Sequence, residues 1–427
     1  MLWKGLKGEI LKLSGAQKIF ILCAMICSFC ITSDYGIVRP VSHSMVLSTY
    51  GSQMFPYIWL AVIPLNLLVV ELYNRFLARL GVLRMFFTIV ITVLAVNAFC
   101  AIFMSKFSFL PFFFYIWKEI YVMLLFQQLW SVVHSTMHMS QAKYIYGILF
   151  AVGGVGGICG SSWPSLFAVS LGSPNLIFAS IPILLILTGA FFFLFKNSSV
   201  SPQESQPQKQ INNFWQGVDA IRKSKYLTFI LLIVVLMQVV TTLIYHQFNI
   251  TLESSVATQD LRTEYCGKVM VIANTLTFTL QLFGSIVLVH FLGLKKSHLL
   301  LPLVLCLNAI GSLFMPTFAM ISFAYITIKA FDFSLFQILK EMLYIPLKQE
   351  EKFKAKSIID VFAYRSAKGL ASCLILVLQS LSLMDFIHSL TIGSLVLLLL
   401  WTAIVYKMFQ LKTEKAEAAE TETGVSQ

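Results

Sequence analysis

Two basic residues three positions apart, Arg365 and Lys368, stand inside an apolar run long enough to cross a membrane. Residues at this spacing share one face of a helix. A charge at the bilayer centre costs about 2.5–3.5 kcal/mol on insertion scales, so such residues usually line a cavity. The pair suits a di- or triphosphate, with Arg365 as a bidentate fork and Lys368 as a point charge. The alternative is that both neutralise buried acids such as Asp360 or Asp332.

The preceding apolar run carries a second charged group, in which Lys329 and Asp332 lie a turn apart and Lys340 returns to the Lys329 face. One interpretation is a structural ion pair between Lys329 and Asp332 within the helix. The other is a pair that breaks when an anion arrives. Lys356 and Asp360, which lie between the two charged groups, are further candidates for contact with that anion.

The segment from Arg39 to Met45 places one cation among hydroxyl groups, with Ser42 as a candidate for contact with a bound anion. Pro40 predicts an interrupted helix here, whose polar backbone would face a central cavity. The alternative is that Arg39 simply lies at the outer membrane interface.

Polar and aromatic residues elsewhere are weaker candidates. Gln127, Gln128 and Trp130 offer hydrogen bonds and stacking for a base, or they pack in the core. Tyr245 and His246 interrupt another apolar run, where they could face the same cavity.

The sequence holds no pattern typical of an enzyme or a metal site. His134 and His138 have helical i, i+4 spacing, but Ser135 stands where a metalloprotease carries glutamate. The eight cysteines lie almost entirely in apolar segments, which favours packing over redox or metal chemistry. No catalytic residues, metal or cofactor are therefore expected, and the protein is not expected to be an enzyme.

Membrane-spanning helices must position the candidate residues, because the composition excludes an ordinary soluble domain. Charged residues make up 12% of the 427 residues and hydrophobic residues 58%, whereas a soluble domain carries about 25% charged residues. One span needs roughly 20 mainly apolar residues. The sequence predicts an all-α membrane protein with twelve spans, at residues 18–37, 54–73, 84–104, 110–136, 143–166, 176–195, 226–249, 268–292, 297–314, 317–340, 358–382 and 387–408.

The distribution of positive charge predicts the orientation. Most of the 31 Lys and Arg lie in the N-terminus, the even-numbered loops and the C-terminus, whereas the odd-numbered loops hold only Arg39, Lys106, Arg262 and Lys268. Cytoplasmic loops carry such an excess, so both termini are expected in the cytoplasm and the protein in the inner membrane. This asymmetry also accounts for the net charge of +12, which therefore does not indicate nucleic-acid binding.

A polar stretch divides the spans six and six. Asn197 to Asn213 is rich in Ser, Pro and Gln, and the apolar Phe214, Val218 and Ile221 that follow have the spacing of an interfacial helix. We expect four parts: an N-terminal six-helix half (1–196), a cytoplasmic linker with the interfacial helix (197–225), a C-terminal six-helix half (226–408) and a disordered cytoplasmic tail (409–427).

A weak internal repeat supports two related halves. Ala142-Lys143-x-Ile145 recurs as Ala355-Lys356-x-Ile358, each copy opening a span. Repeated halves are typical of major facilitator transporters, whose solute sites lie near the bilayer midplane. By the same offset, Val152 and Val155 correspond to Arg365 and Lys368. Around these valines the first half carries small residues at helix-packing spacing, namely Gly153, Gly154, Gly156, Gly157 and Gly160.

The region from Lys340 to Lys368 resembles a signature of the bacterial and plastid ADP/ATP translocase family. The matching residues are Lys340–Pro346, Lys352–Lys356, Ile359–Val361, Arg365 and Lys368, with further similarity at Leu129–Trp130, Ala142–Lys143, Tyr146–Gly147 and Arg39–Ser48. The resemblance implies a monomeric, major facilitator-like transporter in the lipid bilayer that exchanges ATP and ADP by alternating access. It also implies that Arg39, Arg365 and Lys368 neutralise phosphate.

The chain departs from this family at charged positions. Ser42 and His43 stand where the family has Lys-Asp, Gln128 where it has Glu, and Tyr245 where it has an acidic residue. We therefore expect a site that accepts a nucleotide-like anion but separates ATP from ADP poorly, or prefers a less charged nucleotide such as NAD. An unrelated organic solute on the same fold is the alternative, and a membrane enzyme or scaffold a further one.

Overall fold

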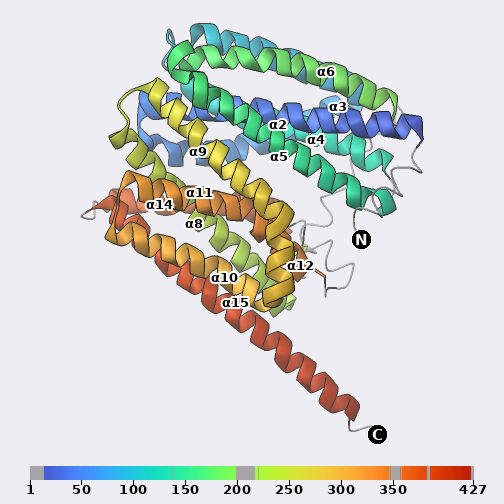
Figure 1. Ribbon diagram of the computed structural model, residues 1–427, viewed down its shortest axis with the longest axis vertical. Coiled ribbons are helices and arrows are strands. Elements are labelled where there is room, and N and C mark those ends of the chain that lie inside the picture. The colour runs from blue at the N-terminus through green and yellow to red at the C-terminus, as the bar shows by residue number, and fades with distance from the viewer. Residues whose placement is uncertain are drawn as a thin grey trace. The chain divides into compact units, whose positions relative to one another are not determined.

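The computed structural model describes residues 14–137, 139–198, 217–219, 221–345, 347, 356, 358–381 and 385–424, and every regular element among them is helical (Figure 1). The α-helices are α2 (Gly15–Tyr50), α3 (Phe55–Phe103), α4 (Leu110–Thr136), α5 (Met139–Leu171), α6 (Ser180–Lys196), α8 (Lys225–Ser255), α9 (Gln259–Thr279), α10 (Ser285–Phe314), α11 (Phe318–Phe331), α12 (Gln337–Leu343), α14 (Tyr364–Ser380) and α15 (Phe386–Gly424). Short 3-10 turns are η1 (Ser52–Met54) and η2 (Ser173–Ala179), and π-helical turns are η3 (Leu280–Gly284), η4 (Asp332–Phe336) and η5 (Ile358–Ala363).

Ten helices in the described part of the chain are long and apolar enough to cross a membrane. The longest, α3, contains Gly81 in a left-handed conformation (φ 73°), which breaks the helix where the second and third predicted spans meet. The eleventh predicted span corresponds to η5 and α14, which together cover residues 358–380. The all-α membrane fold is thus confirmed, with ten long apolar helices, one of which, α3, covers two of the predicted spans.

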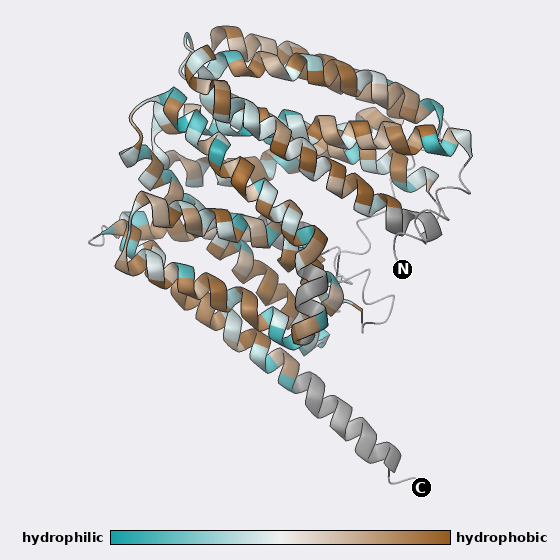
Figure 2. Ribbon diagram, viewed as in Figure 1, coloured by the Kyte–Doolittle hydropathy of each residue, from teal (hydrophilic) through white to brown (hydrophobic). Residues whose placement is uncertain are grey.

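Hydrophobic residues, brown in Figure 2, predominate along most of the helices. Large apolar residues such as Leu67, Leu166 and Phe314 are mostly exposed to the surroundings. A soluble protein would bury residues of this kind, whereas lipid tails solvate them. Their exposure therefore agrees with helices that lie in a bilayer.

The prediction that Pro40 interrupts the first helix is wrong. The helix α2 begins at a Ser14 N-cap with a capping box and continues through Pro40 to Tyr50. Proline removes a single backbone donor, here the partner of the Gly36 carbonyl, while its fixed φ remains helical. Close packing against α5 supports the helix near this point: a Cβ on Gly36 would lie 2.7 Å from the Ser161 nitrogen of α5.

Two compact units divide the chain. The first combines the described residues of Met1–Met54, Pro64–Gln208 and Val256–Phe278; the second combines those of Phe55–Ile63, Lys209–Ser255 and Thr279–Gln427. Each unit therefore includes a short segment from the other half of the sequence. Nearly all of α9 packs with α2 and α5, and the start of α3 packs with α8 and α14.

Close helix packing through glycine, as the sequence predicts, is confirmed in the first unit. A Cβ on Gly153 would lie 2.8 Å from Ser28 Oγ, and one on Gly156 would meet the Phe29 backbone oxygen at 2.5 Å. A Cβ on Gly160 would overlap the Ser33 backbone. The α2 and α5 backbones can approach this closely only because α5 lacks side chains at these positions.

The structure differs from expectation at the C-terminal end. Helix α15 continues to Gly424, beyond its last apolar stretch at Gln410 and through the segment expected to be disordered. Ala, Glu and Lys dominate this stretch, and all three favour helix. In the linker, Val218 and Ile221 lie in short helical pieces, and residues 199–216 with Phe214 lie outside the described residues.

Candidate functional site

The second unit contains a stack of four aromatic rings, which we call the aromatic column. Its members are Trp59 from the start of α3, Tyr245 and Phe248 from α8, and Tyr325 from α11. Ring centres are 5.3 Å apart for Trp59 and Tyr245, 5.1 Å for Tyr245 and Tyr325, and 4.6 Å for Tyr325 and Phe248. The interplanar angles are 25°, 12° and 11°, so the rings are nearly parallel. All four side chains are buried.

Two lysines approach this column from different helices. Lys368 Nζ of α14 lies 5.1 Å from the centre of the Trp59 ring. Lys329 Nζ of α11 lies 5.6 Å from the Tyr245 ring and 6.0 Å from the Tyr325 ring. These distances fall within cation–π range, so the ring faces partly compensate the charges inside an apolar bundle. Both lysines keep part of their surface exposed, whereas the rings do not.

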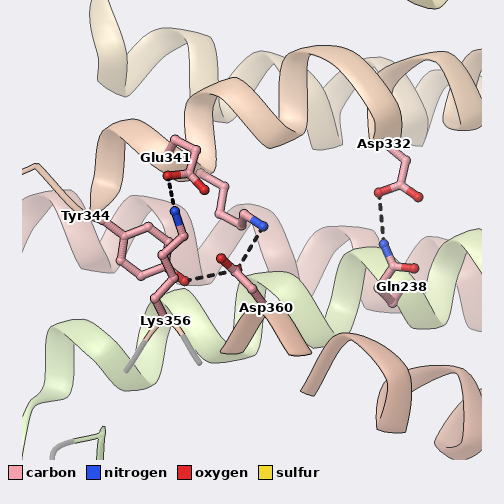
Figure 3. A network of polar contacts seen from close by, with 7 residues as sticks. Gln238, Asp332, Glu341, Tyr344, Lys356 and Asp360 are labelled. Carbon is pink, nitrogen blue, oxygen red and sulfur yellow. Dashed lines mark hydrogen bonds and ion pairs between the residues drawn. The ribbon is translucent and has the colours of Figure 1, made fainter. Parts of the chain in front are cut away.

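A buried acid follows Lys329 by one helical turn. Asp332 opens the π-turn η4, and its Oδ1 accepts a hydrogen bond of 2.9 Å from Gln238 Nε2 of α8 (Figure 3). Single π-turns inserted in a helix frequently occur at functional sites. The structure thus brings Lys329, Asp332, Tyr245 and Lys368, all predicted from the sequence, to one region of the second unit.

Arg365 lies in α14, three residues before Lys368. This spacing places both residues on the same face of the helix. Its side chain lies outside the described part of the structure.

Lys356 and Asp360 take part in a separate ion-pair network (Figure 3). Lys356 Nζ lies 2.6 Å from Glu341 Oε2, and Lys340 Nζ lies 2.9 Å from Asp360 Oδ1. Tyr344 donates a 3.4 Å hydrogen bond to Asp360, and burial together with the neighbouring carboxylates raises the pKa of this phenol well above its ordinary value. No contact among the described residues joins Lys356 or Asp360 to the aromatic column.

The candidates of the first unit lie on α2 and α4. The Arg39 guanidinium lies 5.4 Å from the Tyr35 ring centre. The Ser42 hydroxyl is buried and donates to the Arg39 carbonyl at 3.1 Å, so it bonds within its own helix. Gln128 is fully buried, and neither its Nε2 nor its Oε1 has a hydrogen-bond partner among the described residues.

Other polar residues of α4 pair locally. Lys118 Nζ lies 3.1 Å from Glu119 Oε1 and 3.8 Å from the Tyr115 ring centre, so the two charges that interrupt this span pair with each other. His134 packs against Trp130 at 5.5 Å between ring centres. His138 lies outside the described residues.

Sequence reasoning missed four residues of the second-unit site, namely Trp59, Phe248, Tyr325 and Gln238. Tyr325 carries a signal, because it precedes Lys329 by four positions and so shares its helix face. Trp59 and Gln238 carry none, since only the packing of distant segments brings them to Lys368 and Asp332.

Comparison with known proteins identifies the fold. No protein-family model and no curated protein sequence matches this chain. Among solved structures, the nucleoside transporter NupG is 14% identical, with a TM-score of 0.60 over 92% of this chain and 99% of that one. A bacterial homologue of the iron transporter ferroportin, in an inward-facing state, is 12% identical, with a TM-score of 0.64 over 93% and 99%. An auto-inhibited POT family peptide transporter is 10% identical, with a TM-score of 0.63 over 91% and 96%.

These similarities show that the chain has the major facilitator fold of membrane transporters. The three transporters are named for different solutes, so the fold leaves the substrate open.

Proposed function

We propose that this protein transports a nucleotide-like organic anion by alternating access, and that the aromatic column with Lys329 and Lys368 binds it. The observation that carries the proposal is the approach of two lysines from α11 and α14 to one stack of parallel rings. Stacking on aromatic side chains contributes about 1–3 kcal/mol per base and tolerates any base. Ammonium groups beside the rings supply the charge that phosphate requires.

The charges of the site favour a nucleotide with few phosphates. Lys329, Lys368 and, by helix spacing, Arg365 contribute positive charge, and the buried Asp332 opposes it. A highly charged triphosphate would bring its anionic oxygens near Asp332, where like charges repel. AMP, ADP or NAD therefore fits this set better than ATP. The resemblance to the ADP/ATP translocase family at Lys340–Lys368 supports the nucleotide class.

Uptake competition tests this function. Cells that express the protein would take up labelled ADP, and unlabelled ATP, ADP, AMP and NAD would compete, with an amino acid and a dipeptide as controls. We expect inhibition by the nucleotides and none by the controls. Uptake of peptide or amino acid without any effect of nucleotides would contradict the proposal and favour an unrelated solute.

We further propose that both termini face the cytoplasm, on the basis of the positive-charge asymmetry. A cysteine introduced at Ser205 in the linker should resist an impermeant thiol reagent in intact cells. A cysteine at Ser255, at the end of α8, should react. Labelling of the cysteine at position 205 and not of the one at 255 would show the opposite orientation.

A further inference from the structure

The first unit holds a buried carboxyl group that the proposed site does not use. Asp34 of α2 is fully buried, and its Oδ2 accepts a 2.7 Å hydrogen bond from the Tyr121 hydroxyl of α4. Its Oδ1 has no hydrogen-bond partner among the described residues. No ion pair of the described residues includes Asp34.

The side chains around Asp34 are neutral. Tyr121 comes from α4, and Cys30 lies one turn earlier on α2 itself. The buried Ser180 hydroxyl at the start of α6 lies beside the carboxyl, where it can exchange a hydrogen bond with it. Helix α5 faces this stretch of α2 with Gly160 and Ser161, neither of which titrates.

The cations nearest in sequence have other contacts. Arg39 and Lys118 both approach the ring of Tyr35, at 5.4 and 6.0 Å from its centre. Lys118 also pairs with Glu119, so the charges of α4 compensate each other. Asp34 is thus an acid among neutral neighbours, unlike Asp360, which pairs with Lys340 at 2.9 Å.

Protonation removes a charge that this packing does not compensate. An ionised carboxylate that is buried without a cation costs several kcal/mol, even where the neutral Tyr121 and Ser180 hydroxyls donate to its oxygens. A protonated carboxyl can donate from Oδ1 to the Ser180 hydroxyl while Oδ2 still accepts from Tyr121. A hard metal cation would instead need a cage of several oxygen ligands, more than one carboxylate and two hydroxyls provide.

We propose that Asp34 is the site of a proton that is coupled to transport. The group takes up a proton from water on one side of the membrane and releases it to water on the other; no other bond forms or breaks. In the described packing of α2 against α4, α5 and α6 the proton is bound. Ionisation leaves an uncompensated charge in this packing, so it favours a conformation in which water reaches Asp34. This difference in stability couples the proton to the conformational change.

The inference rests on the protein being a transporter and holds for any solute. Infrared difference spectroscopy of the purified full-length protein can therefore test proton binding without substrate. A carboxyl C=O band that titrates with pH is expected in the wild type and is expected to be lost in Asp34→Asn. Asp260→Asn is the matched control, because Asp260 is a carboxyl of the same unit that accepts a 2.8 Å hydrogen bond from the Ser173 backbone; this variant should keep the band.

A second variant, Tyr121→Phe, keeps the test decisive if Asp34→Asn fails to fold. It keeps the carboxyl but removes the donor that favours the ionised form, so the midpoint of the band should move upward by about one pH unit. A band that persists in Asp34→Asn, or a midpoint unchanged in Tyr121→Phe, would overturn the assignment. Sodium that shifts the band at constant pH would also overturn it, in favour of a sodium site.

A transport measurement separates this inference from the proposed function. In proteoliposomes with an imposed pH gradient, the wild type should accumulate labelled ADP, and Asp34→Asn should exchange ADP without accumulating it. Accumulation by Asp34→Asn equal to that of the wild type would contradict proton coupling. Absence of ADP transport in every variant would contradict the nucleotide proposal, while the infrared result would still decide the assignment of Asp34.

Discussion

The two units of this chain use equivalent helices for different purposes. Helix α5 in the first unit contains one copy of the weak sequence repeat, and α14 in the second unit follows the other. Helix α5 presents Gly153, Gly156 and Gly160 to α2, whereas α14 presents Lys368 to the ring of Trp59. By the repeat, Val152 and Val155 of α5 correspond to Arg365 and Lys368, so the first half is apolar where the second half is cationic. The comparison teaches that one fold can assign dense packing to one half and ligand chemistry to the other.

The acids of the two units differ in the same way. Asp332 in the second unit accepts from Gln238 and follows Lys329 by a turn, so it belongs to a charged site. Asp34 in the first unit has only neutral neighbours. A carboxyl beside cations stays ionised and can respond to an anion, whereas an isolated buried carboxyl responds to protons. The two units thus provide two kinds of chemistry.

Filling the α2–α5 contact should have the largest effect. In Gly160→Val, the new side chain would overlap the Ser33 backbone, which cannot move without separating the helices. We expect a loss of about 3 kcal/mol or more in folding free energy, and hence little folded protein on size-exclusion chromatography. Gly189→Val in α6 is the control, because nothing lies within 4 Å of a Cβ there. Equal behaviour of both variants would refute dense packing in the first unit.

Removing either lysine that approaches the aromatic column should weaken solute binding and leave folding intact. Lys368→Ala and Lys329→Ala should each weaken binding of a nucleotide anion by about 1.5–3 kcal/mol, the range for charged hydrogen bonds. Lys295→Ala is the matched control, because Lys295 also lies over a ring, that of Tyr406 at 5.6 Å, away from the site. Affinities follow from uptake inhibition by ADP. Less folded protein with unchanged affinity would favour purely structural roles for these lysines.

Trp59 should contribute to binding of the base and not of the phosphates. Trp59→Leu removes one ring of the column, and about 1 kcal/mol or more of stacking should be lost. Inhibition by ADP should weaken several-fold, while inhibition by inorganic pyrophosphate should stay the same. Trp163→Leu, which removes an exposed tryptophan that packs on Phe167, is the control. Parallel loss for ADP and pyrophosphate would show that Trp59 only supports Lys368.

Ser42 should have the smallest effect. Its buried hydroxyl bonds the Arg39 carbonyl within α2, and such a bond contributes little to a helix. Ser42→Ala should change ADP uptake less than twofold. A large loss would mean that the hydroxyl leaves its helix to contact the solute, and that the first unit shares in binding.

The sequence predicts the membrane fold well because lipid imposes a simple rule. Every span must be apolar and helical, so hydropathy locates the helices, and Gly81 marks the break within α3. Pro40 misled because proline weakens a helix only locally, while packing along the whole of α2 decides whether the helix continues. Such packing depends on contacts between distant segments, which no local pattern contains.

The candidate site is predictable only in part, for the same reason. Charges inside apolar runs identify Lys329, Asp332 and Lys368, because a charge in a membrane span is costly unless it pairs or lines a cavity. The sequence does not show that Lys368 meets Trp59, because the two residues lie in different halves of the sequence. It also does not show that Lys356 pairs with Glu341, so a basic segment that suggests anion binding is partly neutralised.

Equilibrium binding to the purified protein tests the central claim most directly. Titration of the wild type, Lys368→Ala and Lys295→Ala with ATP, ADP, AMP and NAD compares the four nucleotides and the contribution of Lys368 in one experiment. We predict that the wild type and Lys295→Ala bind at least one of ADP, AMP and NAD as tightly as ATP or more tightly, and that Lys368→Ala binds it about tenfold or more weakly. Binding of none of the four nucleotides, or equal affinities in Lys368→Ala and the wild type, would contradict a nucleotide site at the aromatic column.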